Sequence, residues 1–490
     1  MKIDRQRAYL FLAAGLILAG CKSSTMTTST PAPPSDLIPS LQPYTTPTGT
    51  VSTYTSAGSI DPNGIFFQSL GTNARSCGSC HQLSQGMSIS VPSIQALFSS
   101  SNGTDPLFLA VDGANCPTAA TGDGAAHSLI LNNGLIRIAE GLPATAQFKI
   151  TITQDPYGCA VTTNASTGQQ MYSVYRRPLP AAGLTFLSNV MWDTRDTIAP
   201  LNAASTFSAN LNTDLSAQAA NAVATHEQGS ASLTAAQLAQ LAGFEESLYV
   251  AEATDTEAGS LNAGGATGGA AALAAQSYYP GINDAFGHDP QGAPFNPTVF
   301  TVFQAWEGSQ NAAQASIARG ETVFNTAPMQ ITSVHGLNDN PALGNPTVIN
   351  GTCGTCHDAP NIGNHSLPLP MDIGASRLAA SETDSGIIAG LQQLTAPNLP
   401  IYQITGCTDV NGNPVVYLTT DPGTGLFTGQ CSDVNSVMAP VLRGLAARAP
   451  YFHNGSAATT GDVVKFYSSR FQMNLTPQQM VDLQNFLNAL

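Results

Sequence analysis

The chain has 490 residues, of which 16 are Lys or Arg and 31 are Asp or Glu, so its formal net charge is −15. A hydrophobic share of 42% excludes a wholly disordered protein, and the length allows two or three domains with cores of their own. An acidic balance without a basic cluster argues against nucleic acid as a partner, because phosphate binding depends on grouped Lys and Arg.

The N-terminus predicts export. A basic start precedes a short apolar run over residues 9–18, which is too short to span a bilayer. The run ends in the string LAGC, which resembles a bacterial lipoprotein signal whose cysteine, here Cys21, carries the lipid. The alternative is an ordinary secretory signal with a chance cysteine. We therefore expect residues 1–20 to be a signal peptide and a lipid to be the only membrane anchor. By resemblance to enterobacterial sorting rules, Lys22 favours the outer membrane, facing the periplasm.

Residues 21–58 are expected to form a flexible tether. Ser, Thr and Pro dominate this stretch and large apolar side chains are few, so it has little with which to build a core. No later segment has the uncharged apolar length of a membrane helix.

Four of the nine cysteines stand in two identical frames, Cys77-Gly-Ser-Cys80-His81 and Cys353-Gly-Thr-Cys356-His357. In a CxxCH string the two thiols add to the vinyl groups of a porphyrin and the histidine ligates the iron. The alternatives are a zinc knuckle and a redox dithiol. Zinc needs further Cys or His ligands at regular spacing, and a redox dithiol usually lies in a thioredoxin-like βαβ setting. We therefore expect two covalently bound haem c groups, each with its CxxCH histidine as an iron ligand.

The other cysteines of the mature chain are candidates for disulfides in an oxidising compartment. They are Cys116, Cys159, Cys407 and Cys431. Three pairings are open. Cys116–Cys159 and Cys407–Cys431 are favoured, because they keep each bridge within one half of the chain.

Hydrophobic spacing predicts a mainly helical protein. Short helices are expected ahead of the CxxCH strings, over residues 60–70 and 318–324. Longer helices are expected over residues 215–227 and 233–250. A last helix is expected at the C-terminus, where Thr476 can cap and Pro477 suits the first turn.

A small amount of β-structure is also expected. Phe148, Ile150 and Ile152 alternate with polar residues, which predicts a strand in an inserted region. Residues 256–275 are rich in Gly and Ala and are expected to form a surface loop.

Longer strings resemble one family of exported haem proteins. They are SVYRRPLP (173–180), VMWDTR (190–195), LSAQA (215–219), APVLRGLAARAPYFHNG (439–455) and GDVVKFY (461–467). Together they resemble the bacterial di-haem cytochrome c peroxidases and their MauG relatives, with matches spread over most of the mature chain. Thr194 stands where this family usually has Gly.

The resemblance implies a fold and a division of the chain. The expected fold is mainly α, with two c-type cytochrome domains, loop insertions and a little β. Residues 59–300 would form an N-terminal domain in which peroxide reacts. Residues 301–490 would form a C-terminal electron-transfer domain.

The resemblance also implies roles for individual residues near the first haem. In the family, a Trp at the position of Trp192 lies between the two rings and lets electrons hop; the alternative is a core tryptophan. A peroxidase needs a group that takes a proton from H₂O₂ and returns it to the departing oxygen. Either His226 or Glu227 would do this, and His226 is favoured because an imidazole can shuttle protons near neutral pH. A solvent-facing residue and a resting iron ligand are the alternatives for His226. Gln218 would orient the oxidant.

For the second haem, the resemblance points to Tyr467, where peroxidases of the family carry Met and MauG-type enzymes carry Tyr. A thioether raises the reduction potential of the iron, whereas a phenolate favours Fe(III). Met438 is the competing ligand and Met473 a weaker one. Family members often hold one Ca²⁺ through backbone carbonyls, here those of Arg448 and Pro450, although no acidic cluster in the sequence requires it.

The expected function is the reduction of H₂O₂ to water with electrons relayed from the second haem to the first. Two alternatives stay open: a MauG-like oxidase of a protein or organic substrate that works through high-valent haem iron, and a non-enzymatic electron-transfer lipoprotein. The expected partners are H₂O₂ and a small donor cytochrome or cupredoxin, because an acidic surface suits a basic carrier.

Overall fold

A computed structural model describes residues 37–164, 166–378 and 385–490. The signal peptide expected over residues 1–20 and the lipid site expected at Cys21 lie outside the described residues. None of the described helices combines the length and the apolar character that crossing a bilayer requires.

The prediction of a mainly α-helical fold is wrong, since 30% of the chain is helical and 17% is strand. Ten α-helices occur in the described residues: α1 (Val91–Ser101), α2 (Ser128–Asn133), α3 (Phe207–Thr225), α4 (Ala235–Glu246), α5 (Ala270–Ala274), α6 (Ala312–Thr326), α7 (Ser385–Leu391), α8 (Thr424–Thr428), α9 (Thr460–Arg470) and α10 (Pro477–Asn488).

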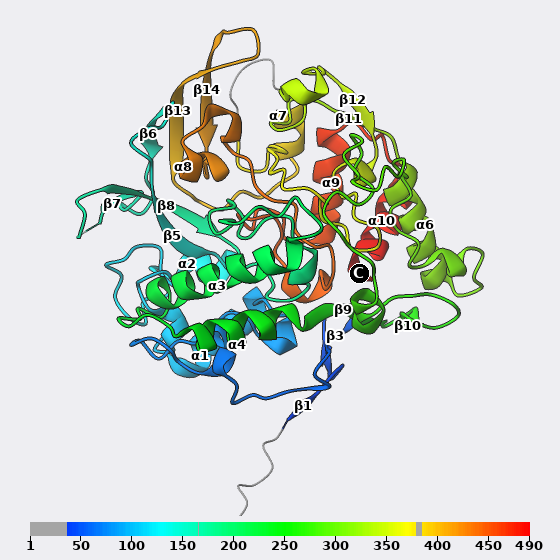
Figure 1. Ribbon diagram of the computed structural model, residues 1–490, viewed down its shortest axis with the longest axis horizontal. Coiled ribbons are helices and arrows are strands. Elements are labelled where there is room, and N and C mark those ends of the chain that lie inside the picture. The colour runs from blue at the N-terminus through cyan, green and yellow to red at the C-terminus, as the bar shows by residue number, and fades with distance from the viewer. Residues whose placement is uncertain (1–36, 165, 379–384) are drawn as a thin grey trace, which may run out of the picture. The chain divides into compact units, whose positions relative to one another are not determined.

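Five antiparallel sheets lie between and around these helices in the described residues (Figure 1). The largest has the order β10-β9-β3-β2, and two three-stranded sheets have the orders β14-β13-β6 and β5-β8-β7. Two pairs, β1-β4 and β11-β12, complete the set. The strands are β1 (Ile38–Pro39), β2 (Pro43–Thr45), β3 (Gly49–Thr55), β4 (Ser59–Ile60), β5 (Ile136–Gly141), β6 (Lys149–Gln154), β7 (Val161–Thr163), β8 (Gln170–Arg176), β9 (Leu248–Asp255), β10 (Gly259–Ser260), β11 (Met329–Ile331), β12 (Ile349–Gly351), β13 (Ile401–Thr408) and β14 (Pro414–Thr419).

The tether expected over residues 21–58 is wrong for its last part, because β1, β2 and β3 lie within it. Most of β3 is buried, and Val51 is fully so. Thr, Val and Tyr side chains suit a half-buried pleated surface, and β3 finds its partner in β9, far along the chain. Local composition does not reveal such a distant partner.

Two helix predictions need similar corrections. The helix expected over residues 233–250 ends at Glu246, because Leu248 already pairs with Thr55 in the β9–β3 ladder. Only a 3₁₀ turn, Ile65–Phe67, forms within residues 60–70. The segment 256–275 contains β10 and α5 in addition to loop.

Figure 1 shows α3 and α4, in green, side by side, and they pack on one another.

The strand expected around Ile150 is confirmed as β6 (Figure 1). It pairs with β13, so that Ile150 lies opposite Ile404. This ladder joins the two halves of the chain, and residues 37–490 form one compact unit. The division at residue 300 stays a prediction.

The helices α6, α9 and α10 contribute buried side chains to the hydrophobic core beside the second CxxCH string. The expected cap of α10 is confirmed, since the Thr476 side chain accepts a hydrogen bond from the Gln479 N–H. Gly320 of α6 lies against α10, where a Cβ would be only 1.9 Å from the Asp482 carbonyl oxygen. Glycine is therefore required for the close approach of these two helices.

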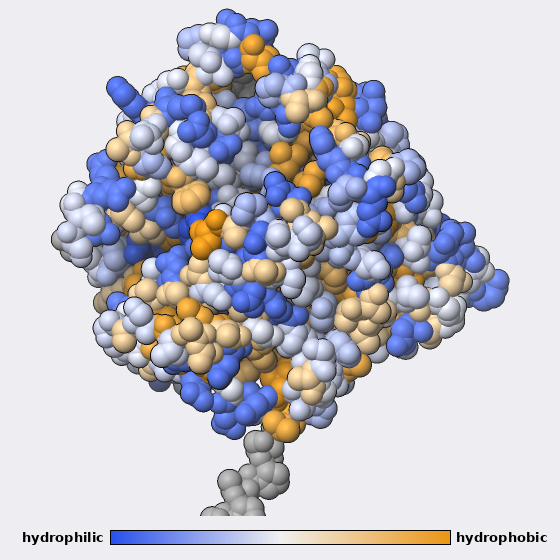
Figure 2. Space-filling model, viewed as in Figure 1, coloured by the Kyte–Doolittle hydropathy of each residue, from blue (hydrophilic) through white to orange (hydrophobic). Residues whose placement is uncertain are grey.

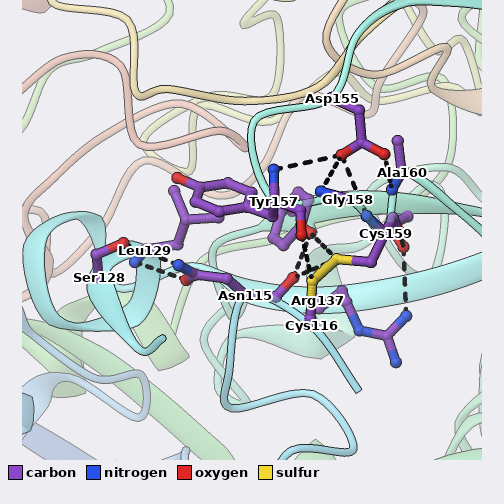
Figure 3. Close-up of a disulfide and its surroundings, with 12 residues drawn as sticks. Asn115, Cys116, Ser128, Leu129, Arg137, Asp155, Tyr157, Gly158, Cys159 and Ala160 are labelled. Atoms are coloured by element: carbon purple, nitrogen blue, oxygen red, sulfur yellow. Dashed lines mark hydrogen bonds between the residues drawn. A yellow bond between two sulfur atoms is a disulfide. The ribbon is translucent and has the colours of Figure 1, made fainter. Parts of the chain in front are cut away.

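Both expected disulfides are confirmed, Cys116–Cys159 and Cys407–Cys431. Figure 3 shows the first of them beside Asp155, whose carboxylate accepts hydrogen bonds from backbone N–H groups that include those of Gly158 and Cys159. On the face drawn in Figure 2, hydrophobic residues are scattered in small groups among hydrophilic ones.

Candidate haem sites

The two CxxCH strings adopt the same local structure. Each begins as a 3₁₀ turn, Cys77–Ser79 and Cys353–Thr355, behind a capping box. In each, the histidine N–H donates to the carbonyl of the first cysteine at 3.0 Å. None of these four cysteines takes part in a disulfide among the described residues.

Each string lies in the wall of its own cavity. The N-terminal cavity, about 170 Å³, is lined by Cys77, Cys80 and His81 together with α3 and α4 side chains. The C-terminal cavity, about 190 Å³, is lined by Cys353, Cys356 and His357 together with α9 and α10 side chains. The similar volumes and the mainly apolar walls suit the same flat, hydrophobic group in both cavities.

The two CxxCH histidines fit a role as iron ligands. The Nδ1 atom of His81 lies 3.1 Å from the Met87 carbonyl oxygen, and that of His357 lies 2.5 Å from the Gly363 carbonyl oxygen. A proton on Nδ1 leaves the Nε2 lone pair for a metal. Burial lowers the pKa of both imidazoles, which favours the neutral form that ligates iron.

The thiols do not resemble a redox dithiol. Burial raises the pKa of Cys353 and of Cys356 to about 12. Reactive dithiols have thiol pKa values below the ordinary range. The residues present therefore fit covalent haem attachment better than thiol–disulfide exchange.

The two cavities share one wall. Trp192, Met438 and Pro440 line both of them, as do Arg177, Pro178 and Leu179. The Trp192 indole N–H donates to the Arg177 carbonyl at 2.8 Å, and the Met438 N–H donates to the Trp192 carbonyl at 2.9 Å. Trp192 is therefore held in the wall that the two cavities share, and its role between two haems stays a prediction.

A His–Asp–Arg chain reaches the N-terminal cavity. His226 follows the last residue of α3, and its Nδ1 lies 2.5 Å from Asp112 Oδ2. The other Asp112 oxygen pairs with the Arg75 guanidinium, and all three side chains line the cavity. Burial alone would raise the pKa of Asp112, but His226 and Arg75 hold it below its ordinary value. The His226 side chain is 32% exposed, so it connects the cavity wall to solvent.

Glu227 and Gln218 line the same cavity. One carboxylate oxygen of Glu227 accepts from the N–H groups of Leu70 and Gly71, at 2.7 and 3.1 Å. Glu227 thus holds the segment that leads into the first CxxCH string, which the sequence did not indicate. Gln218 lies on α3, within the LSAQA string.

Glu245 is a further acidic group of the N-terminal cavity, and sequence reasoning missed it. It is buried at the end of α4, and its Oε2 has no hydrogen-bond partner. Burial, reinforced by the charge of Glu246, raises the pKa of Glu245 to about 8. A carboxyl in the helix sequence AGFEES gives no signal of this, because only the tertiary packing buries it.

We expect Glu245→Gln to remove part of the loss of stability at alkaline pH. Between the ordinary glutamate pKa of 4.5 and about 8, the folded protein holds a proton that the unfolded chain has released. Stability therefore falls through this window by up to about 1.4 kcal/mol per pH unit. Urea unfolding at pH 5 and pH 8 should show a smaller pH dependence in Glu245→Gln than in the wild type. An unchanged pH dependence would place the Glu245 carboxyl in water instead.

The C-terminal cavity contains both expected ligands of the second iron. Tyr467 lies on α9 with Thr460, Val463 and Val464, and these residues face the cavity at helical spacing. Burial raises the pKa of the Tyr467 phenol, so that an apolar pocket alone favours the protonated form. Met438 is buried in the shared wall. Met473 also lines this cavity.

The residues of the expected calcium site have other contacts. The Arg448 carbonyl accepts a hydrogen bond from Arg177 Nη2 at 3.1 Å. Arg448 and Pro450 both line the C-terminal cavity. Calcium at this place stays a prediction.

A buried ion cluster holds the WDTR string. Arg176 Nη1 lies 2.5 Å from Asp193 Oδ2, and Arg176 Nε lies 2.7 Å from Asp421 Oδ2. Arg195 also pairs with Asp193, at 2.9 Å. Thr194 has a φ of 64°, in the left-handed region that a β-branched residue rarely adopts, at the place where the family usually has Gly.

Comparisons with known proteins give a limited result. No family model matches the chain, and no curated protein matches it. One solved structure, titled "Crystal structure of a MauG-like protein associated with microbial copper homeostasis", matches at 14% identity over 68% of this chain and 79% of that chain, with a TM-score of 0.28. This likeness is too distant to assign a family.

Proposed function

We propose that the protein is a di-haem c-type oxidoreductase that reduces H₂O₂ to water, with electrons passing from the C-terminal to the N-terminal cavity. One observation carries the proposal: two CxxCH strings line two cavities of similar size, and the cavities share a wall that contains Trp192.

Cys77 and Cys80 would hold one haem and Cys353 and Cys356 the other, with His81 and His357 as the iron ligands. When bound, haem would supply a redox-active iron in each cavity. The reduction of H₂O₂ to water consumes electrons and protons in equal number, so the chain must also deliver protons.

His226 is well placed to deliver those protons. Its ring lies in the wall of the N-terminal cavity, is partly exposed, and is oriented through Nδ1 by Asp112. Asp112 favours a proton on Nδ1, which leaves the Nε2 atom of the ring for proton exchange. Arg75 fixes Asp112 from its other side. Gln218 would orient the oxidant.

A MauG-like oxidation of a protein or organic substrate is the second candidate. The observation that favours it is Tyr467 in the C-terminal cavity, because a phenolate ligand stabilises oxidised iron. Met438 in the shared wall favours the peroxidase instead, since a thioether ligand raises the reduction potential.

We infer the cellular location and the electron donor from the net charge and from the N-terminal signal. We place the mature protein on the outer membrane by its lipid, facing the periplasm. A basic cytochrome or cupredoxin would be the donor, because the chain carries a net charge of −15.

The test is a steady-state assay of the purified holoprotein with H₂O₂ and a reduced small cytochrome, beside His226→Ala. The holoprotein should contain two haems by pyridine haemochrome and turn over peroxide. His226→Ala should lower kcat by about 100-fold, the usual range for loss of a general acid–base group.

The matched control is His335→Ala. His335 also pairs with a carboxylate, Asp339, but lines neither cavity. The His335→Ala variant should leave kcat unchanged. Fewer than two haems, or no turnover of peroxide by the wild type, would contradict the proposed function. Equal turnover in His226→Ala would remove His226 from the proton path.

A further inference from the structure

Three buried side chains lie together outside both cavities. They are Asp284, Asp358 and His365, and one ligand atom from each lies within 4.8 Å of the other two. We infer that Asp284, Asp358 and His365 form a site for a divalent transition-metal ion of the zinc type, separate from the haems.

Each of the two carboxyl groups has one oxygen that accepts a hydrogen bond and one buried oxygen that accepts none. Asp284 Oδ2 accepts from the His288 N–H at 2.8 Å, and Asp358 Oδ1 accepts from the Ser366 N–H at 2.7 Å. The other carboxylate oxygens, Asp284 Oδ1 and Asp358 Oδ2, are buried without a hydrogen bond. Buried polar atoms of this kind are rare unless a ligand completes them.

The His365 ring also has one nitrogen with a partner and one without. His365 Nδ1 lies 3.2 Å from the Cys356 carbonyl oxygen and 3.2 Å from Asp358 Oδ2, whereas its Nε2 is buried without a partner. Asp284, Asp358 and His365 have 1%, 0% and 1% of their surface exposed. The cluster is therefore a closed polar site and not an acidic surface patch.

The cluster has no Lys or Arg partner among the residues that the structure describes. The other titratable neighbour of Asp284 is His288, whose side chain is 54% exposed and whose Nδ1 lies 3.0 Å from Asp284 Oδ2. Two buried carboxyl groups and a buried imidazole, each with an unpartnered polar atom, form a donor set that a divalent ion can complete.

The donor set selects the kind of metal. Ca²⁺ and Mg²⁺ take oxygen ligands, whereas Zn²⁺ accepts imidazole nitrogen with carboxylate oxygen. Zinc bonds of about 2.0–2.2 Å require ligand atoms no more than about 4.4 Å apart, so a small side-chain shift closes the site. The buried Ser366 hydroxyl, which interacts with the Asp358 side chain, offers a further oxygen beside the cluster.

The proposal can be tested on the holoprotein after chelation and dialysis, with ZnCl₂ as the probe. Isothermal titration should find one zinc equivalent, and zinc-edge anomalous diffraction should place it at Asp284, Asp358 and His365. The variants Asp284→Asn and His365→Gln should each weaken zinc binding by at least about tenfold. The wild type should also gain thermal stability with zinc, and the variants should not.

Asp289→Asn is the matched control. Asp289 is a nearby buried carboxylate whose oxygens already accept from Asn283 N–H and Gln291 N–H, and it lies outside the cluster. It should bind zinc as the wild type does. No zinc equivalent in the wild type, an anomalous peak elsewhere, or equal affinity in Asp284→Asn would overturn the proposal. Calcium binding at the same affinity as zinc would overturn the choice of metal. None of these outcomes depends on peroxide turnover.

Discussion

Replacing Trp192 by Phe is expected to lower peroxide turnover by about 100-fold, which corresponds to about 2.7 kcal/mol in activation free energy. Trp192 belongs to the wall that the two cavities share, and hydrogen bonds fix it at both its indole N–H and its carbonyl. Phenylalanine keeps an aromatic ring there but is much harder to oxidise. Electrons then have no intermediate hopping site between the two haems. Stopped-flow spectroscopy should show slower electron transfer between the haems, with both haems still attached.

The matched control is the other tryptophan of the chain, Trp306. It also donates its indole N–H to a backbone carbonyl, that of Ala263, but it stacks on Phe303 in the core and lines neither cavity. Trp306→Phe should leave electron transfer between the haems unchanged. If Trp192→Phe transferred electrons at the wild-type rate, Trp192 would be a packing residue and the relay would use another path.

Arg176→Met should destabilise the protein by about 3–5 kcal/mol. The Arg176 guanidinium is 1% exposed and faces two carboxylates that are equally buried, Asp193 and Asp421. Its removal leaves Asp421 without its guanidinium and Asp193 with only Arg195. Because Asp421 lies in the second half of the chain and Asp193 in the first, the loss should also loosen the packing of the two halves. Urea unfolding of the holoprotein measures the change.

Arg319→Met provides the contrast. Arg319 pairs with Asp482, but its side chain is 53% exposed, and Asp482 also accepts from Ser316 and Gln478. A pair of this kind contributes about 0–1 kcal/mol. Similar losses of stability in the two variants would show that burial of the Arg176 pairs adds nothing.

Local chemistry could be predicted from the sequence where it depends on spacing. The CxxCH strings form matching turns, the cap of α10 at Thr476 is present, and both disulfides have the expected partners. These features depend on residues that are adjacent in the chain or, for the cysteines, on a small number of possible pairs.

The strands were underestimated for a physical reason. β3 pairs with β9, and β6 pairs with β13, across long stretches of sequence. A short run such as residues 49–55 carries little periodicity of its own, and only its distant partner makes it a strand. The helix expected up to Val250 gave way to β9 for the same reason.

The amino-acid sequence alone showed two CxxCH strings, favoured one pairing of the four remaining cysteines, and singled out Trp192, His226 and Tyr467 as candidate site residues. The folded structure was needed to show that the two cavities share a wall at Trp192, that Asp112 orients His226, and that Glu245 and the Asp284–Asp358–His365 cluster are buried. Attachment chemistry acts over a few neighbouring residues. Burial, charge pairing and the shared cavity wall arise from contacts between segments that are distant in the chain.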